Sequence, residues 1–148
     1  MIHEKVNLLL ADDDTDDCTF FREALEELPV TASLTTVNDG VQLMKLLTKN
    51  LNPIPDILYL DLNMPCKNGF ECLSEIKSND KLKYLPVIIY STSFDIDIAD
   101  TLFENGAHFY IRKPAEFPNL KKVILKSIAL IVENKNGHPS KEEFVISR

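Results

Sequence analysis

Short apolar runs alternate along the chain with longer stretches in which apolar residues recur every three or four positions. The short runs predict five β-strands, and the longer stretches predict five α-helices, one after each strand. The expected strands span residues 6–11, 32–38, 57–60, 87–90 and 108–112. Strict alternation of strands and helices is typical of a parallel sheet that is covered by helices on both faces. The pattern therefore predicts an α/β fold.

Capping residues and prolines mark where the helices begin and end. Asp14 or Thr15 can cap the first helix, and Pro29 ends it. Gly106 suits the left-handed cap that closes the fourth helix, and Pro118 suits the first position of the fifth. The residues expected to face the core from the second, third and fourth helices include Val41, Phe70 and Ile98.

The strands differ in their polarity, and this difference suggests an order. The first strand lacks alternation, as expected of a central strand that is covered on both faces, whereas the second alternates and suits a sheet edge. If the order is 2-1-3-4-5, the first and third strands are neighbours where the order reverses. We expect a doubly wound, three-layer sandwich around a parallel five-stranded sheet.

The composition is that of an ordinary globular protein. Of the 148 residues, 45% are hydrophobic and 26% are charged, which suits one domain with one core. The formal net charge of −7 argues against direct binding of nucleic acid, because such binding depends on Lys and Arg. The apolar run 128–132 is too short to span a membrane, and the N-terminus lacks a signal-peptide pattern. We therefore expect a cytoplasmic protein that does not insert into membranes.

Polar residues with reactive side chains follow four of the five expected strands. Asp12 and Asp13 follow the first strand, Asp61 the third, Ser91 the fourth and Lys113 the fifth. Because the carboxyl ends of parallel strands share one edge of the sheet, these side chains are expected to meet there. The first and third strands would bring the three carboxylates together in one pocket.

Three neighbouring carboxylates repel one another unless protons or a cation compensate their charge. A donor set of oxygen atoms alone favours a hard divalent ion, and Mg²⁺ fits best because it is usually held by one or two carboxylates and a phosphate. A metal ion, an ammonium group and a hydroxyl around a carboxylate suit phosphoryl transfer, with the carboxylate as acceptor.

Four segments, each in the right order and after the right strand, resemble a known family. The sequence is similar to the response-regulator receiver domains (CheY-like) of two-component signalling. The matching segments are Leu-Leu-Leu-Ala-Asp-Asp-Asp at 8–14, Leu-Tyr-Leu-Asp-Leu-Asn-Met-Pro at 58–65, Pro-Val-Ile-Ile-Tyr-Ser at 86–91 and Gly-Ala-His-Phe-Tyr-Ile-Arg-Lys-Pro at 106–114. The resemblance covers residues 5–133 and implies a flavodoxin-like (βα)5 fold.

The resemblance also implies a role for each site residue. Asp61 would accept a phosphoryl group from a phosphohistidine on a sensor histidine kinase or a histidine phosphotransfer protein. Mg²⁺ would be held by the side chains of Asp13 and Asp61, by Asp12 mainly through water, and by the backbone carbonyl of Asn63. The regulator would assist its own phosphorylation and dephosphorylation without being an enzyme in the usual sense.

Three further residues would complete the family's switch. Lys113 would contact the phosphoryl oxygens, and Ser91 would donate a hydrogen bond to one of them. Movement of Ser91 would be coupled to burial of Tyr110, which remodels the face formed by the fourth helix, fifth strand and fifth helix. That face is also where we expect a partner protein of unknown identity, or a second copy in a homodimer, to bind.

Two segments are interpreted more plainly. Asp14, Asp16 and Asp17 extend the acidic cluster, but a helix start attracts such residues, so capping explains them better than metal binding does. Residues 134–148 are predicted to be a polar C-terminal tail without an output domain. We therefore expect a stand-alone response regulator that signals through protein contacts.

Two alternatives remain from the sequence. One is a binding module that keeps the receiver fold but acts independently of phosphorylation. The other is an aspartate-nucleophile phosphatase of the haloacid dehalogenase kind, because Asp61-Leu62-Asn63 superficially resembles its DxD motif. The second fits less well, since that motif normally follows the first strand and Asn63 cannot donate a proton as an acid.

Overall fold

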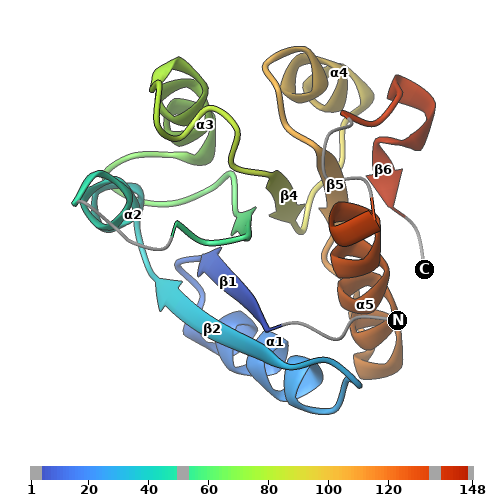
Figure 1. Ribbon diagram of the computed structural model, residues 1–148. Helices are drawn as coiled ribbons and strands as arrows, with labels where there is room; N and C mark the ends of the chain where they lie inside the picture. Colours follow the sequence, from blue (N-terminus) through green and yellow to red (C-terminus); the bar gives the residue numbers. More distant parts are fainter. Residues whose placement is uncertain (1–4, 50–53, 134–137, 147–148) are drawn as a thin grey trace.

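The five predicted strands and five predicted helices all form in the predicted order (Figure 1). The computed structural model describes residues 5–49, 54–133 and 138–146. The strands are β1 (Val6–Ala11), β2 (Ala32–Val37), β3 (Ile57–Leu60), β4 (Val87–Ser91), β5 (Phe109–Arg112) and a short β6 (Val145–Ile146). The helices are α1 (Thr15–Glu26), α2 (Gly40–Thr48), α3 (Gly69–Ser78), α4 (Ile96–Glu104) and α5 (Phe117–Glu133).

All strands are parallel, and their order is β2-β1-β3-β4-β5-β6, which confirms the predicted order of the first five. The order reverses beside β1, which lies between β2 and β3. Ala11, the last residue of β1, pairs with Val37 on one side and with Leu60 on the other. The residues that follow β1 and β3 therefore begin side by side at one edge of the sheet.

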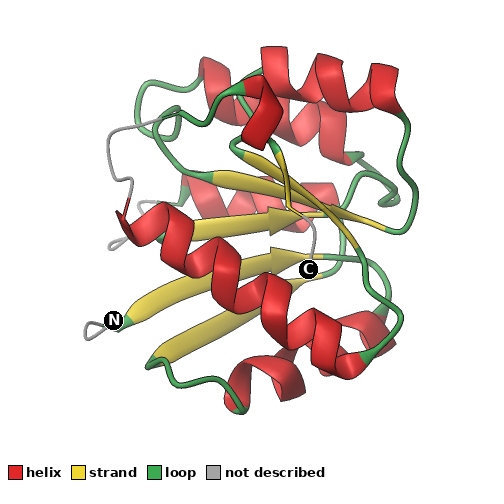
Figure 2. Ribbon diagram, turned by 90° about the vertical axis from the view of Figure 1, so that its right-hand side faces the viewer, coloured by secondary structure: helices red, strands yellow, loops and turns green. Residues whose placement is uncertain are grey.

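Helices cover both faces of this sheet, as Figures 1 and 2 show. Phe21 of α1 and Ile124 of α5 belong to the core on one face. On the other face, Leu43, Leu73 and Leu102 bring α2, α3 and α4 into a second core. Because the central strands are buried on both sides, they consist almost entirely of apolar residues. The polar residues at their ends therefore lie at an edge of the sheet from which the apolar layers exclude part of the water. No helix in the described parts of the chain is long and apolar enough to span a membrane.

The helix ends are fixed by the local signals in the sequence. Asp14 caps α1, because its carboxylate accepts hydrogen bonds from the backbone N–H groups of Asp16 and Asp17. Gly106 closes α4 with a φ of 98°, a left-handed conformation that favours glycine, and its N–H donates to the carbonyl of Phe103. Both predicted caps are confirmed, with Asp14 rather than Thr15 as the first.

Three predicted core residues lie at the surface instead. Val41, Phe70 and Ile98 have exposed fractions of 39%, 36% and 40%. Each lies on the flank of its helix, beside the narrow stripe that contacts the sheet. A helix on one face of a sheet buries only this stripe, so apolar residues at its border stay in contact with water.

The last described segment adds a strand that the sequence analysis did not predict. Residues 138–146 return to the sheet through a short 3₁₀ helix, η1 (Lys141–Glu143), and β6 pairs with β5 at Tyr110 and Ile111. Phe144 and Ile146 are buried in the two cores, whereas Val145 between them is 41% exposed. Part of the expected polar tail is therefore the sixth strand of the sheet, because two alternating apolar side chains suffice to dock it.

The burial of Phe144 predicts how much the docked segment stabilises the fold. We expect Phe144→Ala to lower the free energy of unfolding by roughly 3 kcal/mol, because it removes a buried ring that packs against Phe103 and Tyr110. Urea unfolding followed by circular dichroism measures this change. Val145→Ala, at the next residue of the same segment, is the matched control and is expected to change stability by less than about 0.5 kcal/mol. Equal stabilities of the Phe144→Ala variant and the wild type would contradict the docking of this segment on the sheet.

Candidate functional site

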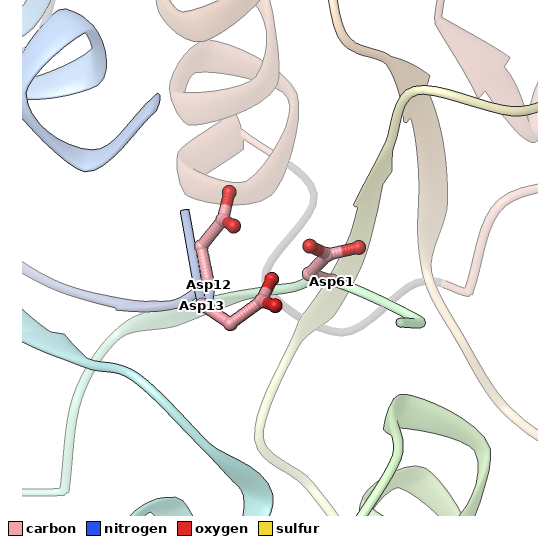
Figure 3. Close-up of side chains that lie close together, drawn as sticks. All are labelled: Asp12, Asp13 and Asp61. Carbon is pink, nitrogen blue, oxygen red and sulfur yellow. The ribbon is translucent and has the colours of Figure 1, made fainter. Parts of the chain in front are cut away.

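The three carboxylates that the sequence placed at the ends of β1 and β3 do meet. Asp12, Asp13 and Asp61 each offer an oxygen atom, and these atoms lie within 4.8 Å of one another (Figure 3). Asp12 is completely buried and Asp61 is 5% exposed, whereas Asp13 is open to solvent. The adjacency of β1 and β3 thus produces an acidic pocket with a buried floor and an exposed rim.

Asp12 is held by its backbone as well as by its side chain. Its N–H donates to the carbonyl of Val37, and its own carbonyl accepts from the Asn38 amide at 3.2 Å and from the Cys18 thiol at 3.5 Å. Its Oδ1 accepts from the backbone N–H of Asp14 at 3.0 Å. The carboxylate orientation is therefore fixed by β1, β2 and α1 together.

Asp61 is fixed by the turn that follows β3. Its N–H donates to the carbonyl of Ala11, and its Oδ1 accepts from the backbone N–H of Asn63 at 3.2 Å. Gly69 lies against this turn, and a Cβ atom at its position would be only 2.4 Å from the carbonyl oxygen of Asp61. Glycine at position 69 therefore allows α3 to begin directly behind the acidic turn. Asn63 itself is exposed.

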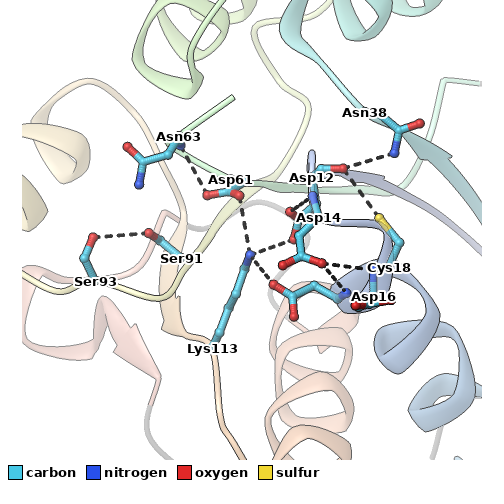
Figure 4. A network of polar contacts seen from close by, with 11 residues as sticks. Asp12, Asp14, Asp16, Cys18, Asn38, Asp61, Asn63, Ser91, Ser93 and Lys113 are labelled. Carbon is cyan, nitrogen blue, oxygen red and sulfur yellow. Dashed lines mark hydrogen bonds and ion pairs between the residues drawn. The ribbon is translucent and has the colours of Figure 1, made fainter. Parts of the chain in front are cut away.

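Lys113 brings a positive charge from the end of β5, as the sequence predicted. Its backbone N–H donates to the carbonyl of Ser91, and its side chain is only 8% exposed. The ammonium nitrogen lies 2.8 Å from Asp12 Oδ2 and 3.4 Å from Asp61 Oδ2 (Figure 4). A third carboxylate, that of Asp17, lies 2.9 Å away.

The contact of Asp17 is the feature of this site that the sequence analysis missed. The acidic residues at the start of α1 were assigned to capping, which is correct for Asp14. Asp17 lies one turn into the helix and reaches the end of β5, 96 residues away in the chain. Only the helix phase, which places position 17 rather than position 16 toward β5, could have indicated this contact.

Burial and charge shift the pKa values of the central pair. Burial raises the pKa of Asp12 from 3.8 to about 7, and Asp61 adds to this increase, although Lys113 and the Asp14 N–H oppose it. Burial by itself lowers the pKa of Lys113, but the carboxylates of Asp12, Asp17 and Asp61 raise it overall. The lysine therefore stays protonated while the carboxylates around it remain in excess.

This excess of negative charge fits a divalent cation. Asp12 Oδ2 is buried and accepts no hydrogen bond of good geometry, although it lies at ion-pair distance from Lys113. An unsatisfied carboxylate oxygen beside two further carboxylates gives a donor set of oxygen atoms, which Mg²⁺ and Mn²⁺ prefer. Asp12, Asp13 and Asp61 are the residues that could hold such an ion.

The predicted hydroxyl and switch residues lie beside the acidic pocket. Ser91, at the end of β4, is completely buried, and its Oγ lies 3.4 Å from Oγ of Ser93 (Figure 4). Tyr110, on β5, is 1% exposed, and its hydroxyl donates to the backbone carbonyl of Ser93. Phe94 packs edge-on against the Tyr110 ring with centroids 5.3 Å apart. The loop after β4 thus links Ser91 to Tyr110.

Solved structures with a similar fold include two response regulators. The phosphorylated cyanobacterial phytochrome response regulator RcpA is 33% identical, with a TM-score of 0.76 over 93% of this chain and 100% of its own. The Mn²⁺-bound form of the response regulator Rcp1 is 29% identical, with a TM-score of 0.75 over 91% of this chain and 99% of its own. The fold therefore has counterparts of known structure.

Sequence comparison agrees with the structural comparison. Response regulator Rcp1 of Synechocystis sp. (strain ATCC 27184 / PCC 6803 / Kazusa) is 31% identical over 121 residues, which cover 79% of this chain and 82% of Rcp1. The probable methanogenesis regulatory protein FilR2 of Methanothrix harundinacea (strain 6Ac) is 28% identical over 120 residues, which cover 79% of this chain and 77% of FilR2. The profile of the response regulator receiver domain matches residues 8–125. The chain belongs to the response regulator receiver domain family.

Proposed function

We propose that this protein is a cytoplasmic response regulator whose Asp61 accepts a phosphoryl group from a phosphohistidine. The donor is a sensor histidine kinase or a histidine phosphotransfer protein. The observation that carries the proposal is the meeting of three carboxylates with the buried ammonium group of Lys113. The assignment of residues 5–133 to the receiver domain is supported by the family match at residues 8–125 and by the structural match to RcpA.

The proposed reaction needs charge neutralisation more than it needs proton transfer. Asp12, Asp13, Asp61 and the backbone carbonyl of Asn63 would hold Mg²⁺, which would supply positive charge to the phosphoryl oxygens. A carboxylate oxygen of Asp61 forms the new P–O bond while the P–N bond of the phosphohistidine breaks. Lys113, which follows β5 at the same edge of the sheet, stabilises the negative charge on the phosphoryl oxygens.

The output of the proposed regulator passes through Ser91 and Tyr110. Ser91 ends β4, the neighbour of β3, and would donate a hydrogen bond to a phosphoryl oxygen on Asp61. Tyr110 contacts the loop after β4 through Ser93. Movement of this loop changes the face formed by α4, β5 and α5, to which a partner protein or a second copy would bind. The protein is then a signalling protein that promotes its own phosphorylation and dephosphorylation.

The phosphatase alternative has less support. It needs a carboxylic acid two residues after the nucleophile to protonate a leaving group. Position 63 is asparagine, and Asn63 contacts Asp61 through its backbone N–H. Asn63 therefore argues against a phosphatase that turns over a substrate at this pocket.

Substitution of the acceptor tests the proposal directly. We expect Asp61→Asn to abolish incorporation of a phosphoryl group from acetyl phosphate in the presence of Mg²⁺, because the amide cannot form the acyl phosphate. Intact-protein mass spectrometry measures the incorporation, and treatment with hydroxylamine identifies the acyl linkage. Asp80→Asn, at an exposed position, makes the same change in charge and should leave the incorporation unchanged. Undiminished phosphorylation of Asp61→Asn would refute the assignment, and an unreactive wild type would favour the phosphorylation-independent module.

The raised pKa of Asp12 predicts an unusual pH dependence of stability in metal-free buffer. Between pH 3.8 and about 7 the folded protein keeps a proton on Asp12 that the unfolded chain has released. This contribution to the free energy of unfolding is therefore complete below pH 3.8 and is lost as the pH rises through about 7. Added Mg²⁺ should restore stability at the upper end of this range, because it replaces the proton.

Urea unfolding of the wild type and of Asp12→Asn, each with a chelator and with Mg²⁺, measures this effect. The asparagine variant should lack this part of the pH dependence and most of the stabilisation by Mg²⁺. Parallel stability curves of the two proteins across the whole range would show that Asp12 titrates normally.

Removal of the Ser91 hydroxyl should uncouple the pocket from Tyr110. We expect Ser91→Ala to lower the rate of phosphorylation by acetyl phosphate about tenfold, since one hydrogen bond to a charged oxygen is lost. The NMR shifts of the Tyr110 ring on phosphorylation should also become smaller. Thr92→Ala removes a neighbouring exposed hydroxyl and should change neither quantity. Equal effects of the two substitutions would argue against a specific role of Ser91.

A further inference from the structure

Asp17 connects the start of α1 to the end of β5, and capping of α1 does not require this contact. Asp14 already caps α1, and Asp17 contributes to that cap only through its backbone N–H. Its carboxylate instead accepts a hydrogen bond from the ammonium group of Lys113 at 2.9 Å. The Asp17 side chain is 33% exposed, whereas that of Lys113 is 8% exposed.

The distances show which carboxylates hold the lysine. The ammonium nitrogen is 2.8 Å from Asp12 and 2.9 Å from Asp17, but 3.4 Å from Asp61. The acceptor therefore has the longest of the three contacts. The ammonium group already faces three carboxylates, so a phosphoryl group that binds Lys113 competes with them for its positive charge.

One of these existing partners can be released at low cost. Asp12 is completely buried, and without a positive neighbour its charge would lie unpaired in the core. Asp17 is partly open to water, which can hydrate its carboxylate once the lysine has moved away. The contact between Lys113 and Asp17 is therefore the one that gives way.

We propose that Asp17 is a positioning residue that competes with Asp61 for Lys113 and keeps the Lys113–Asp61 contact the longest of the three until a phosphoryl group arrives. This inference rests on the proposed function of Asp61. Asp17 lowers the affinity of the pocket for a phosphoryl group in two ways: it competes for the lysine, and it repels the incoming negative charge. Phosphorylation breaks the contact and frees the first turn of α1 from β5.

Beryllium fluoride with Mg²⁺ provides a probe that mimics the phosphoryl group without group transfer. Titrations followed by ¹⁹F NMR at saturating Mg²⁺ give the concentration of beryllium fluoride for half-saturation. We expect Asp17→Asn to lower this concentration about two- to fivefold, the range for loss of a partly exposed ion pair. The rate of phosphorylation by acetyl phosphate should rise by a similar factor.

Asp16→Asn is the matched control. Asp16 lies in the same first turn, has the same charge and contacts the cap through its backbone N–H. Asp16→Asn removes the same charge near the positive end of the helix dipole as Asp17→Asn does, but it leaves the contacts of Lys113 unchanged. It should therefore shift the beryllium fluoride concentration for half-saturation much less. Asp17→Glu keeps the charge and should restore values close to those of the wild type.

The outcomes separate the inference from the proposed function. Unchanged or weaker binding by Asp17→Asn, or equal shifts in Asp16→Asn and Asp17→Asn, would overturn the role of Asp17 while leaving Asp61 as acceptor. A wild type that binds no beryllium fluoride and takes up no phosphoryl group would overturn both. Tighter binding by Asp17→Asn alone, with recovery in Asp17→Glu, supports the proposal.

Discussion

Repulsion among carboxylates at the ends of β1 and β3 is the constraint on which the rest of the structure depends. Two neighbouring parallel strands deliver Asp12 and Asp61 to nearly the same point, and the apolar layers around them exclude most of the water that would screen their charges. The fold tolerates this only because Lys113 reaches the same point from β5. A site that is still too negative after this compensation is suited to bind cations and, through them, phosphate.

The surrounding fold keeps these charges from relaxing away from one another. Asp12 uses both backbone polar groups in contacts with β2, α1 and the Asn38 side chain, so its side chain has little freedom to turn outward. Gly69 lets α3 begin directly behind Asp61 and closes the turn from that side. The electrostatic strain is thus balanced by ordinary packing and hydrogen bonding in three layers, not by any unusual local structure.

The sequence predicted those site residues whose positions follow from local patterns, such as the end of an apolar strand. The carboxyl ends of apolar strands identified Asp12, Asp13, Asp61, Ser91 and Lys113, because a parallel sheet forces such ends to share one edge. Asp17 was missed because helix capping explained it equally well, and only the helix phase distinguishes it from Asp16. Whether the loop after β4 moves with phosphorylation is not encoded in any local pattern.

The strand β6 was also too short to predict from the sequence, and its docking changes one edge of the sheet. Phe144 and Ile146 offered too short an alternation to predict a strand, yet they dock β6 on the sheet. One edge of the sheet is therefore the two-residue β6 instead of the longer, apolar β5, whereas β2 forms the other edge. Such a short edge strand offers few free backbone N–H and C=O groups to neighbouring molecules. The segment therefore protects this edge from edge-to-edge pairing and aggregation. A shortened chain that stops after α5 would lose this protection while keeping every residue of the acidic pocket.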